Sequence, residues 1–267
     1  MIFPVLGQTL GPYRLLAGIA LGGRAAVFRG RDERSERVVA VKVPVEGALA
    51  GPAIRLRLRR EAEALGRLRH PSVAALLDSG SQDGIDFLVL EYVEGPALAD
   101  RLKEGPLEEA AVLALGAQLA SALAEAHRQG VLHCDVKPGN VLLPPGGPLK
   151  LIDFGQARLA GDDAPIPDSR KALREDGGTI PYMAPEWYQG RRPDARVDLW
   201  SLGVLLYEAA TGRRPFRNGD PEEIVAAVLG ETPAPPSAVR PGLSARFDRI
   251  VLRALEKDPD RRALDLQ

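Results

Sequence analysis

The chain has 267 residues, of which 45% are hydrophobic and 27% charged, enough to bury the core of one large or two modest domains. Its 35 basic and 36 acidic residues give a formal net charge of −1, which lacks the basic excess of a nucleic-acid-binding protein. The single cysteine, Cys134, cannot form an internal disulfide, so we expect a reducing, cytoplasmic location.

No membrane span is expected. Residues 1–10 lack the basic region that begins a signal peptide. The two most apolar helical patterns, at 112–126 and 199–210, are interrupted by polar side chains that include Glu125 and Glu208. We therefore expect a soluble protein.

The first third of the chain is predicted to form strands around one helix. Residues 53–68 place apolar side chains at helical spacing among Arg and Glu, which predicts an amphipathic helix. Gly22-Gly23 marks a hairpin turn between two strands. The strand patterns cover residues 13–20, 25–31, 38–43, 74–79 and 86–91.

The rest of the chain is predicted to be mostly helical. Gly95-Pro96 breaks the pattern, so we divide the chain into an N-terminal lobe, 1–94, and a C-terminal lobe, 95–267. Residues 160–178 have no periodicity and predict a long functional loop. Helices are predicted at 106–130, 197–211, 220–229 and 244–256, and short strands at 141–143 and 149–152. The predicted fold class is α+β and bilobal, with a ligand cleft between a sheet lobe and a helical lobe.

Phosphoryl transfer from ATP requires a cation on the phosphates, oxygen ligands for Mg²⁺ and a group that accepts a hydroxyl proton. Candidates for each occur in order along the chain. They are Val39-Ala-Val-Lys42, His133-Cys-Asp-Val-Lys-Pro-Gly-Asn140, Asp153-Phe-Gly155 and Ala184-Pro-Glu186. These motifs resemble those of the eukaryotic-like protein kinases found in bacteria. The lysine two residues after Asp135 is typical of the Ser/Thr branch.

The resemblance implies a catalytic role for five residues. Lys42 would hold the ATP phosphates while paired with Glu61, and Asp135 would accept the proton of the substrate hydroxyl. Lys137 would neutralise the transferring phosphoryl group, and Thr179 would contact the catalytic aspartate. For Lys42 and Glu61 the alternative is an ordinary strand lysine and a solvated helical glutamate. The ordered set favours the catalytic interpretation.

The resemblance also implies sites for a metal and for ATP. Asn140 and Asp153 would bind Mg²⁺ or Mn²⁺, since oxygen ligands suit both ions. The adenine contacts would come from apolar walls and from the backbone of the hinge, although the apolar positions could equally be core residues. The implied nucleotide contacts, besides Lys42, are Ala20, Gly22, Val27, Ala40, Leu90, Glu91, Val93 and Leu142.

The match extends to the C-terminal region. Asp198 corresponds to the aspartate on the central helix of the family's larger lobe. Arg262 corresponds to the arginine that pairs with Glu186. Both belong to the part of the fold that supports a protein substrate, so the implied partners are protein substrates. A homodimer, as in bacterial relatives, stays open.

The glycine-rich loop departs from the family pattern. Aligned through Val27, the family's Gly-x-Gly-x-x-Gly is here Ala20-Leu-Gly22-Gly-Arg-Ala25, so only the middle glycine is kept. A methyl group at the other two positions limits φ and adds bulk where backbone amides approach phosphate. We expect weaker or slower use of ATP.

Cys134 is a second departure, because many kinases have an arginine there that receives a phosphate from the activation loop. Within 154–185 the hydroxyl side chains are Ser169, Thr179 and Tyr182. We therefore predict activity that is not switched by activation-loop phosphorylation. The thiol itself is expected to be a buried small side chain, and a redox role is the alternative.

Two other functions stay open. A pseudokinase that only binds nucleotide or scaffolds other proteins is favoured by the altered glycine loop, but not by the retained catalytic residues. The second is a small-molecule kinase of the aminoglycoside or choline type. Such enzymes generally lack the Ala-Pro-Glu element and the aspartate-bearing helix, and this chain has both, at Ala184-Pro-Glu186 and around Asp198, so this alternative is less favoured.

Overall fold

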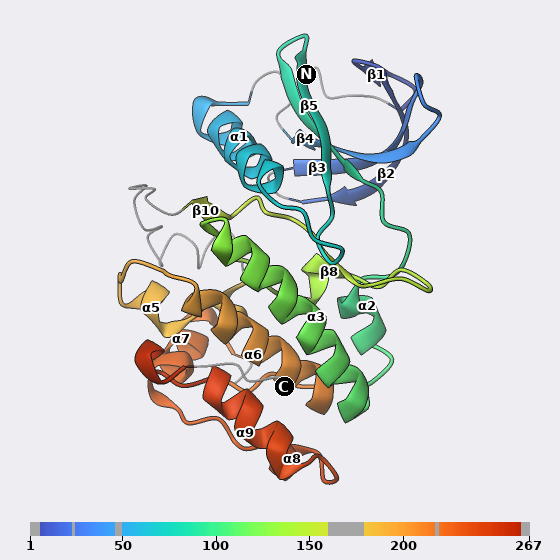
Figure 1. Ribbon diagram of the computed structural model, residues 1–267. Coiled ribbons are helices and arrows are strands. Elements are labelled where there is room, and N and C mark those ends of the chain that lie inside the picture. The colour runs from blue at the N-terminus through green and yellow to red at the C-terminus, as the bar shows by residue number, and fades with distance from the viewer. Residues whose placement is uncertain (1–5, 23–24, 46–49, 160–178, 217–218, 263–267) are drawn as a thin grey trace.

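A computed structural model describes residues 6–22, 25–45, 50–159, 179–216 and 219–262 of the chain. The predicted loop at 160–178, including Ser169, and the turn residues Gly23 and Arg24 lie outside the described residues. Figure 1 shows a sheet and one long helix at one end of the molecule, and the remaining helices at the other. A sheet region and a helical region form the bilobal arrangement that the sequence predicts, so the predicted α+β fold class is confirmed.

The N-terminal region is a six-stranded antiparallel sheet with the strand order β1-β2-β3-β4-β6-β5. Its inward side chains form a separate apolar cluster that includes Leu15, Phe28, Val41 and Val89. The β-branched run in β4 explains why that strand lies in the middle of the sheet. The strands are β1 (Thr9–Leu10), β2 (Tyr13–Leu21), β3 (Ala25–Asp32), β4 (Val38–Pro44), β5 (Leu76–Gln82) and β6 (Ile85–Glu91).

Helix α1 (Pro52–Gly66) packs against β4, β5 and β6. Proline suits its first position, where the backbone N–H would have no intrahelical partner. Leu58, Ala64 and Leu65 are buried, as the amphipathic pattern predicts. Glu61 shares their buried face, and a buried carboxylate needs a partner.

Two long helices form the centre of the C-terminal region. In α6 (Arg196–Thr211) most residues are buried, and Trp200 and Leu205 are fully enclosed. Helix α3 (Glu109–Arg128) packs along α6. The other helices are α2 (Leu98–Leu102), α5 (Pro185–Tyr188), α7 (Pro221–Gly230), α8 (Pro236–Val239) and α9 (Ala245–Ala254). The short strands are β7 (Val131–Leu132), β8 (Val141–Leu142), β9 (Lys150–Leu151) and β10 (Arg158–Leu159).

Among the described residues, α3 is the one helix with the length and composition of a membrane span. Its apolar side chains have another explanation. Val112, Leu119 and Leu123 are buried in the same core cluster as α6. The apolar character of α3 therefore fits a core helix.

The ends of the two central helices follow glycine signals. Gly212 adopts a left-handed φ of 74° directly after α6, and Gly130 has a φ of 70° beyond α3. The prediction that the first of these long helices starts at Pro106 was wrong, since α3 begins at Glu109. Short elements such as α2, α5 and α8 were not predicted, because four or five residues hold too little of a helical period to detect.

The segment between β6 and α2 passes close to the start of the β8–β9 hairpin. Gly95 has a φ of 140°, and a Cβ built on it would overlap the backbone carbonyl of Leu143. Leu143 in turn donates its N–H to the carbonyl oxygen of Pro96 at 2.9 Å. Only glycine fits here. The division between residues 94 and 95 falls in this segment and stays a prediction.

A buried ion pair joins the start of α5 to the end of the described chain. Arg262 donates to the two carboxylate oxygens of Glu186 at 2.6 and 3.0 Å. The side chains are 0% and 6% exposed. Arg262 also donates to the carbonyl oxygen of Arg196, and its guanidinium lies 5.2 Å from the ring centre of Trp200. The pairing of Arg262 with Glu186 was predicted.

We expect Arg262→Met to lower the free energy of unfolding by about 3–5 kcal/mol, because Glu186 would be left as an unpaired buried charge. The matched control is Arg261→Met at the neighbouring residue, whose side chain is 77% exposed, and it should change stability by less than about 0.5 kcal/mol. Urea unfolding measures both variants. Equal midpoints for the two would contradict the assignment.

Candidate active site

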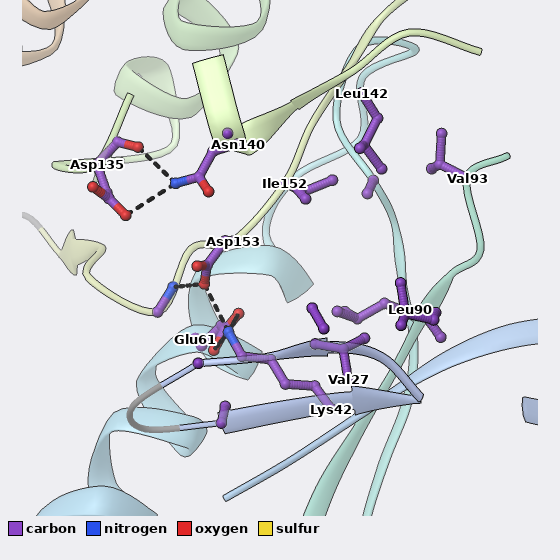
Figure 2. Close-up of a pocket in the computed structure, with 18 of the residues that line it drawn as sticks. Val27, Lys42, Glu61, Leu90, Val93, Asp135, Asn140, Leu142, Ile152 and Asp153 are labelled. Atoms are coloured by element: carbon purple, nitrogen blue, oxygen red, sulfur yellow. Dashed lines mark hydrogen bonds and ion pairs between the residues drawn. The ribbon is translucent and has the colours of Figure 1, made fainter. Parts of the chain in front are cut away.

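A cavity of about 740 Å³ lies where the sheet meets the helical region, and Figure 2 shows some of the residues that line it. Every predicted site residue except Thr179 lines this cavity. Those residues are Ala20, Gly22, Val27, Ala40, Lys42, Glu61, Leu90, Glu91, Val93, Asp135, Lys137, Asn140, Leu142 and Asp153. Thr179 reaches the site through a hydrogen bond to Asp135. Side chains from both regions therefore meet at one place.

Lys42 joins three elements inside the cavity. From β4 its Nζ donates to both carboxylate oxygens of Glu61 on α1, at 2.7 and 2.8 Å, and to Asp153 Oδ1 at 2.7 Å. Burial opposes the charge of Lys42, but the two carboxylates raise its pKa above the ordinary value. The ammonium group therefore stays protonated, and it ties the sheet, α1 and the segment after β9 together.

Gly155 makes this cluster sterically possible. A Cβ at Gly155 would lie 3.0 Å from Asp153 Oδ1 and 3.3 Å from both Lys42 Nζ and Glu61 Oε2. Gly155 also donates its N–H to Asp153 Oδ1 at 3.2 Å. Although burial opposes ionisation of Asp153, Lys42 and this N–H hold its pKa below the usual range. Asp153 is therefore a carboxylate.

The carboxylate of Asp135 is held by three side chains. Lys137 Nζ donates to its two oxygens at 2.9 and 2.8 Å. Asn140 Nδ2 donates to Oδ2 at 2.9 Å, as Figure 2 shows. Thr179 donates its hydroxyl to Oδ1 at 3.0 Å and accepts from Lys137 at 2.8 Å. Asp135 is 4% exposed. A carboxylate so fixed can orient a hydroxyl group and accept its proton.

Asp198 on α6 fixes the backbone just before Asp135. Its carboxylate accepts the N–H of His133 at 2.9 Å and of Cys134 at 2.8 Å, and His127 donates to it from Nε2 at 2.8 Å. Full burial opposes ionisation of Asp198. Its pKa is nevertheless held below the usual range, mainly by the hydrogen bond and the charge of His127. Cys134 has a φ of 63°, a left-handed conformation that few non-glycine residues adopt. These bonds hold that conformation.

His133 links the loop that carries Asp135 to the segment that carries Asp153. Its Nδ1 accepts the N–H of Asp135 at 3.2 Å, and its Nε2 donates to the carbonyl oxygen of Ile152 at 3.2 Å. The ring also packs edge-on against Phe154, with centroids 4.5 Å apart. Movement of one segment is therefore coupled to the other.

The oxygen atoms that could hold a metal are on Asn140 and Asp153. Asn140 uses its Nδ2 for hydrogen bonds, and Asp153 uses Oδ1. In the described part of the chain, Asn140 Oδ1 and Asp153 Oδ2 have no hydrogen bond, and no three His, Cys, Asp or Glu side chains cluster as a metal site. A pair of oxygen ligands fits Mg²⁺, which is usually held by one or two carboxylates together with substrate phosphates and water.

The residues that line the cavity and that the sequence interpretation missed include Ile19, Asp100 and Ile152. Ile19 and Ile152 stand directly before Ala20 and Asp153, so the motif positions could have indicated them. Asp100 lies on α2, a helix that was not predicted, so no sequence signal indicated it.

Cys134, which was expected to be a small buried side chain, is partly buried. It packs against the edge of the large apolar cluster. Burial, followed by the negative charge of Asp198, raises the pKa of its thiol well above the usual range. The thiol is therefore protonated at neutral pH, which argues against a reactive cysteine.

A family model described as a protein kinase domain matches residues 13–264. A probable serine/threonine-protein kinase of Clostridium perfringens is 35% identical over 257 residues, covering 96% of this chain and 37% of the relative. The serine/threonine-protein kinase PknB of Mycobacterium tuberculosis is 37% identical over 94% of this chain and 40% of its own length. The serine/threonine-protein kinase pkn3 of Myxococcus xanthus is 38% identical over 95% of this chain and 48% of its own length. The chain thus spans less than half the length of these relatives.

We expect Cys134 to react slowly with thiol reagents in the folded protein. A raised pKa lowers the thiolate fraction and partial burial limits access, so alkylation by iodoacetamide at pH 8 should be at least about tenfold slower than in guanidinium chloride. Mass spectrometry measures both rates at this single cysteine. Equal rates in folded and unfolded protein would show that the thiol is activated or fully accessible.

Proposed function

This chain belongs to the protein kinase family, and from that membership we propose that it transfers the γ-phosphoryl group of ATP to Ser and Thr hydroxyl groups of proteins. Members of the family use ATP and a divalent metal ion. One observation carries the proposal: the Lys42–Glu61 pair and the Asp135–Lys137 pair line the same cavity. The names of the similar bacterial proteins support the Ser/Thr specificity.

Adenine would lie at the apolar end of the cavity. Val27 and Ala40 would cover one face of the base, and Leu142 the other. The N–H of Glu91 already donates to the carbonyl oxygen of Ala75 at 2.8 Å. We therefore assign the carbonyl oxygen of Glu91, together with the backbone N–H of Val93, to the hydrogen bonds with adenine.

The phosphates would lie beside Lys42, whose ammonium group neutralises their charge. Asn140 Oδ1 and Asp153 Oδ2 would hold Mg²⁺ or Mn²⁺, and either ion would supply further positive charge beside the phosphates. Because Glu61 and Asp153 both accept hydrogen bonds from Lys42, its position is set before the nucleotide arrives. Such preorganisation is the main contribution that a protein makes to this reaction.

In the transfer step the substrate hydroxyl oxygen forms a bond to the γ-phosphorus. The bond between that phosphorus and the β,γ-bridging oxygen breaks, and ADP leaves with the electron pair. Asp135 orients the hydroxyl group and accepts its proton. Lys137 lies 2.8 Å from Asp135 Oδ2, where its charge can neutralise the moving phosphoryl group.

We further propose that phosphorylation of the activation loop does not switch this activity, because Cys134 carries no charge that would bind a phosphate.

Retention of the Lys42 and Asp135 clusters favours an enzyme over a pseudokinase, the alternative that the altered glycine loop supports. The need for ATP and the single cysteine favour a cytoplasmic location. Protein substrates are the proposed partners.

We expect Asp135→Asn to lower phosphate transfer from γ-labelled ATP to dephosphorylated casein by at least about 10²-fold, because the amide cannot accept the proton. Asp83→Asn, on the exposed β5–β6 turn, is the matched control and should retain activity. Label on Ser or Thr is identified after acid hydrolysis. Binding of ATP by the wild-type chain without any transfer would favour the pseudokinase.

Ser169 lies outside the described residues. We expect Ser169→Ala to leave the initial rate of phosphate transfer unchanged, because the residue directly before Asp135 is Cys134 and not an arginine that could bind a loop phosphate. Treatment of the wild-type protein with a phosphatase should likewise leave the rate unchanged. Initial rates with the same casein substrate measure both effects. Loss of activity in either experiment would contradict independence from loop phosphorylation.

A further inference from the structure

A second ion pair lies behind the segment that would hold adenine. Lys150 Nζ on β9 donates to Oε2 of Glu91, the last residue of β6, at 2.9 Å, and lies 2.8 Å from Oε1 of the same carboxylate. The side chains are 16% and 25% exposed. The two residues are 59 positions apart in the sequence. One belongs to the sheet, and the other belongs to the hairpin that joins the helical region.

The carboxylate of Glu91 connects three segments. Besides Lys150, it accepts the backbone N–H of Ala75 at 3.1 Å, just before β5. The backbone N–H of Glu91 donates to the carbonyl oxygen of Ala75 at 2.8 Å. Rotation of Glu91 away from this arrangement would therefore break bonds to both the main chain and Lys150.

Glu91 also lines two cavities. Its front side borders the 740 Å³ cavity, and its rear side borders a cavity of about 290 Å³ that is lined in part by His70 and Lys150. Lys150 stands opposite Leu142 in the pairing of β8 with β9. The ion pair therefore joins the adenine-contacting hinge strand to the hairpin that forms the opposite wall of the nucleotide site.

We propose that Lys150 is a positioning residue that sets the distance between the hinge at Glu91 and the wall at Leu142, and thereby the affinity for the adenine nucleotide. The inference rests on the proposed function, because it takes the front cavity as the nucleotide site. The pair is partly buried and Lys150 Nζ lies within 2.9 Å of both carboxylate oxygens of Glu91, so it restricts motion more than an exposed ion pair does. Its Glu91 end is further fixed by Ala75.

The interaction stabilises the assembled state of the site. Lys42, Glu61 and Asp153 are joined in the same structure that contains the Lys150–Glu91 pair. Loss of the pair should let the two walls separate and weaken nucleotide binding. It should not change the groups that perform the transfer, so kcat at saturating ATP should change less than the KM for ATP.

The test is isothermal titration of the chain with the non-hydrolysable analogue AMP-PNP and Mg²⁺. We expect Lys150→Met to raise the Kd about fivefold, and Lys150→Arg, which keeps a charged donor, to restore affinity close to that of wild type. Arg67→Met removes an exposed ion pair with Glu63 and should leave the Kd unchanged. The binding stoichiometry reports the folded fraction, so a loss of fold is distinguished from a loss of affinity.

A double-mutant cycle with Glu91→Gln assigns the effect to the pair. Because the glutamine still accepts the N–H of Ala75, the cycle isolates the interaction with Lys150, and the double variant should bind no more weakly than Lys150→Met alone. An unchanged or lower Kd for Lys150→Met would overturn the proposal, as would additive effects. Binding of AMP-PNP by a chain that transfers no phosphate would overturn only the proposed kinase activity. Absence of binding to the wild-type chain would overturn both.

Discussion

The catalytic loop depends on the buried carboxylate of Asp198. A charge with no exposure in a helical core is unfavourable unless hydrogen bonds compensate for the lost water. Here the compensation comes from His127 and from two successive N–H groups of the loop, and this second contribution forces Cys134 into a left-handed φ. The hydrogen bonds that stabilise the buried carboxylate of Asp198 thus also fix the backbone that carries Asp135. A catalytic loop attached only by its side chains would lack that restraint.

A continuous set of contacts leads from this point to the sheet. His133, whose N–H is held by Asp198, contacts Ile152 and Phe154, and these flank Asp153. Asp153 accepts from Lys42 on the sheet. The two halves of the site are therefore assembled together, and a change in either half has a physical route to the other. Lys150 and Glu91 add a separate connection on the far side of the nucleotide cavity.

Sequence patterns predicted the parts of the fold that have a full period or a motif. The helices α1, α3 and α6 and the β-branched strand β4 are long enough for their spacing to be diagnostic. Fourteen of the fifteen predicted site residues line the cavity. They could be predicted because each belongs to, or is aligned by, a motif that occurs in the expected order along the chain. The Glu91–Lys150 pair was not predicted, since nothing in either local segment indicates a partner 59 residues away. Pairing across the fold becomes visible only when β9 is placed beside the hinge.

The backbone at Gly95 limits which substitutions the protein can tolerate. Its φ of 140° and its contact with Leu143 exclude every side chain, so any missense change at this codon must push the hinge segment away from the β8–β9 hairpin. Such a change would alter the depth of the nucleotide cavity without touching one of its polar groups. A variant survey should therefore find position 95 as intolerant as the catalytic aspartate, but for a reason of clearance rather than chemistry.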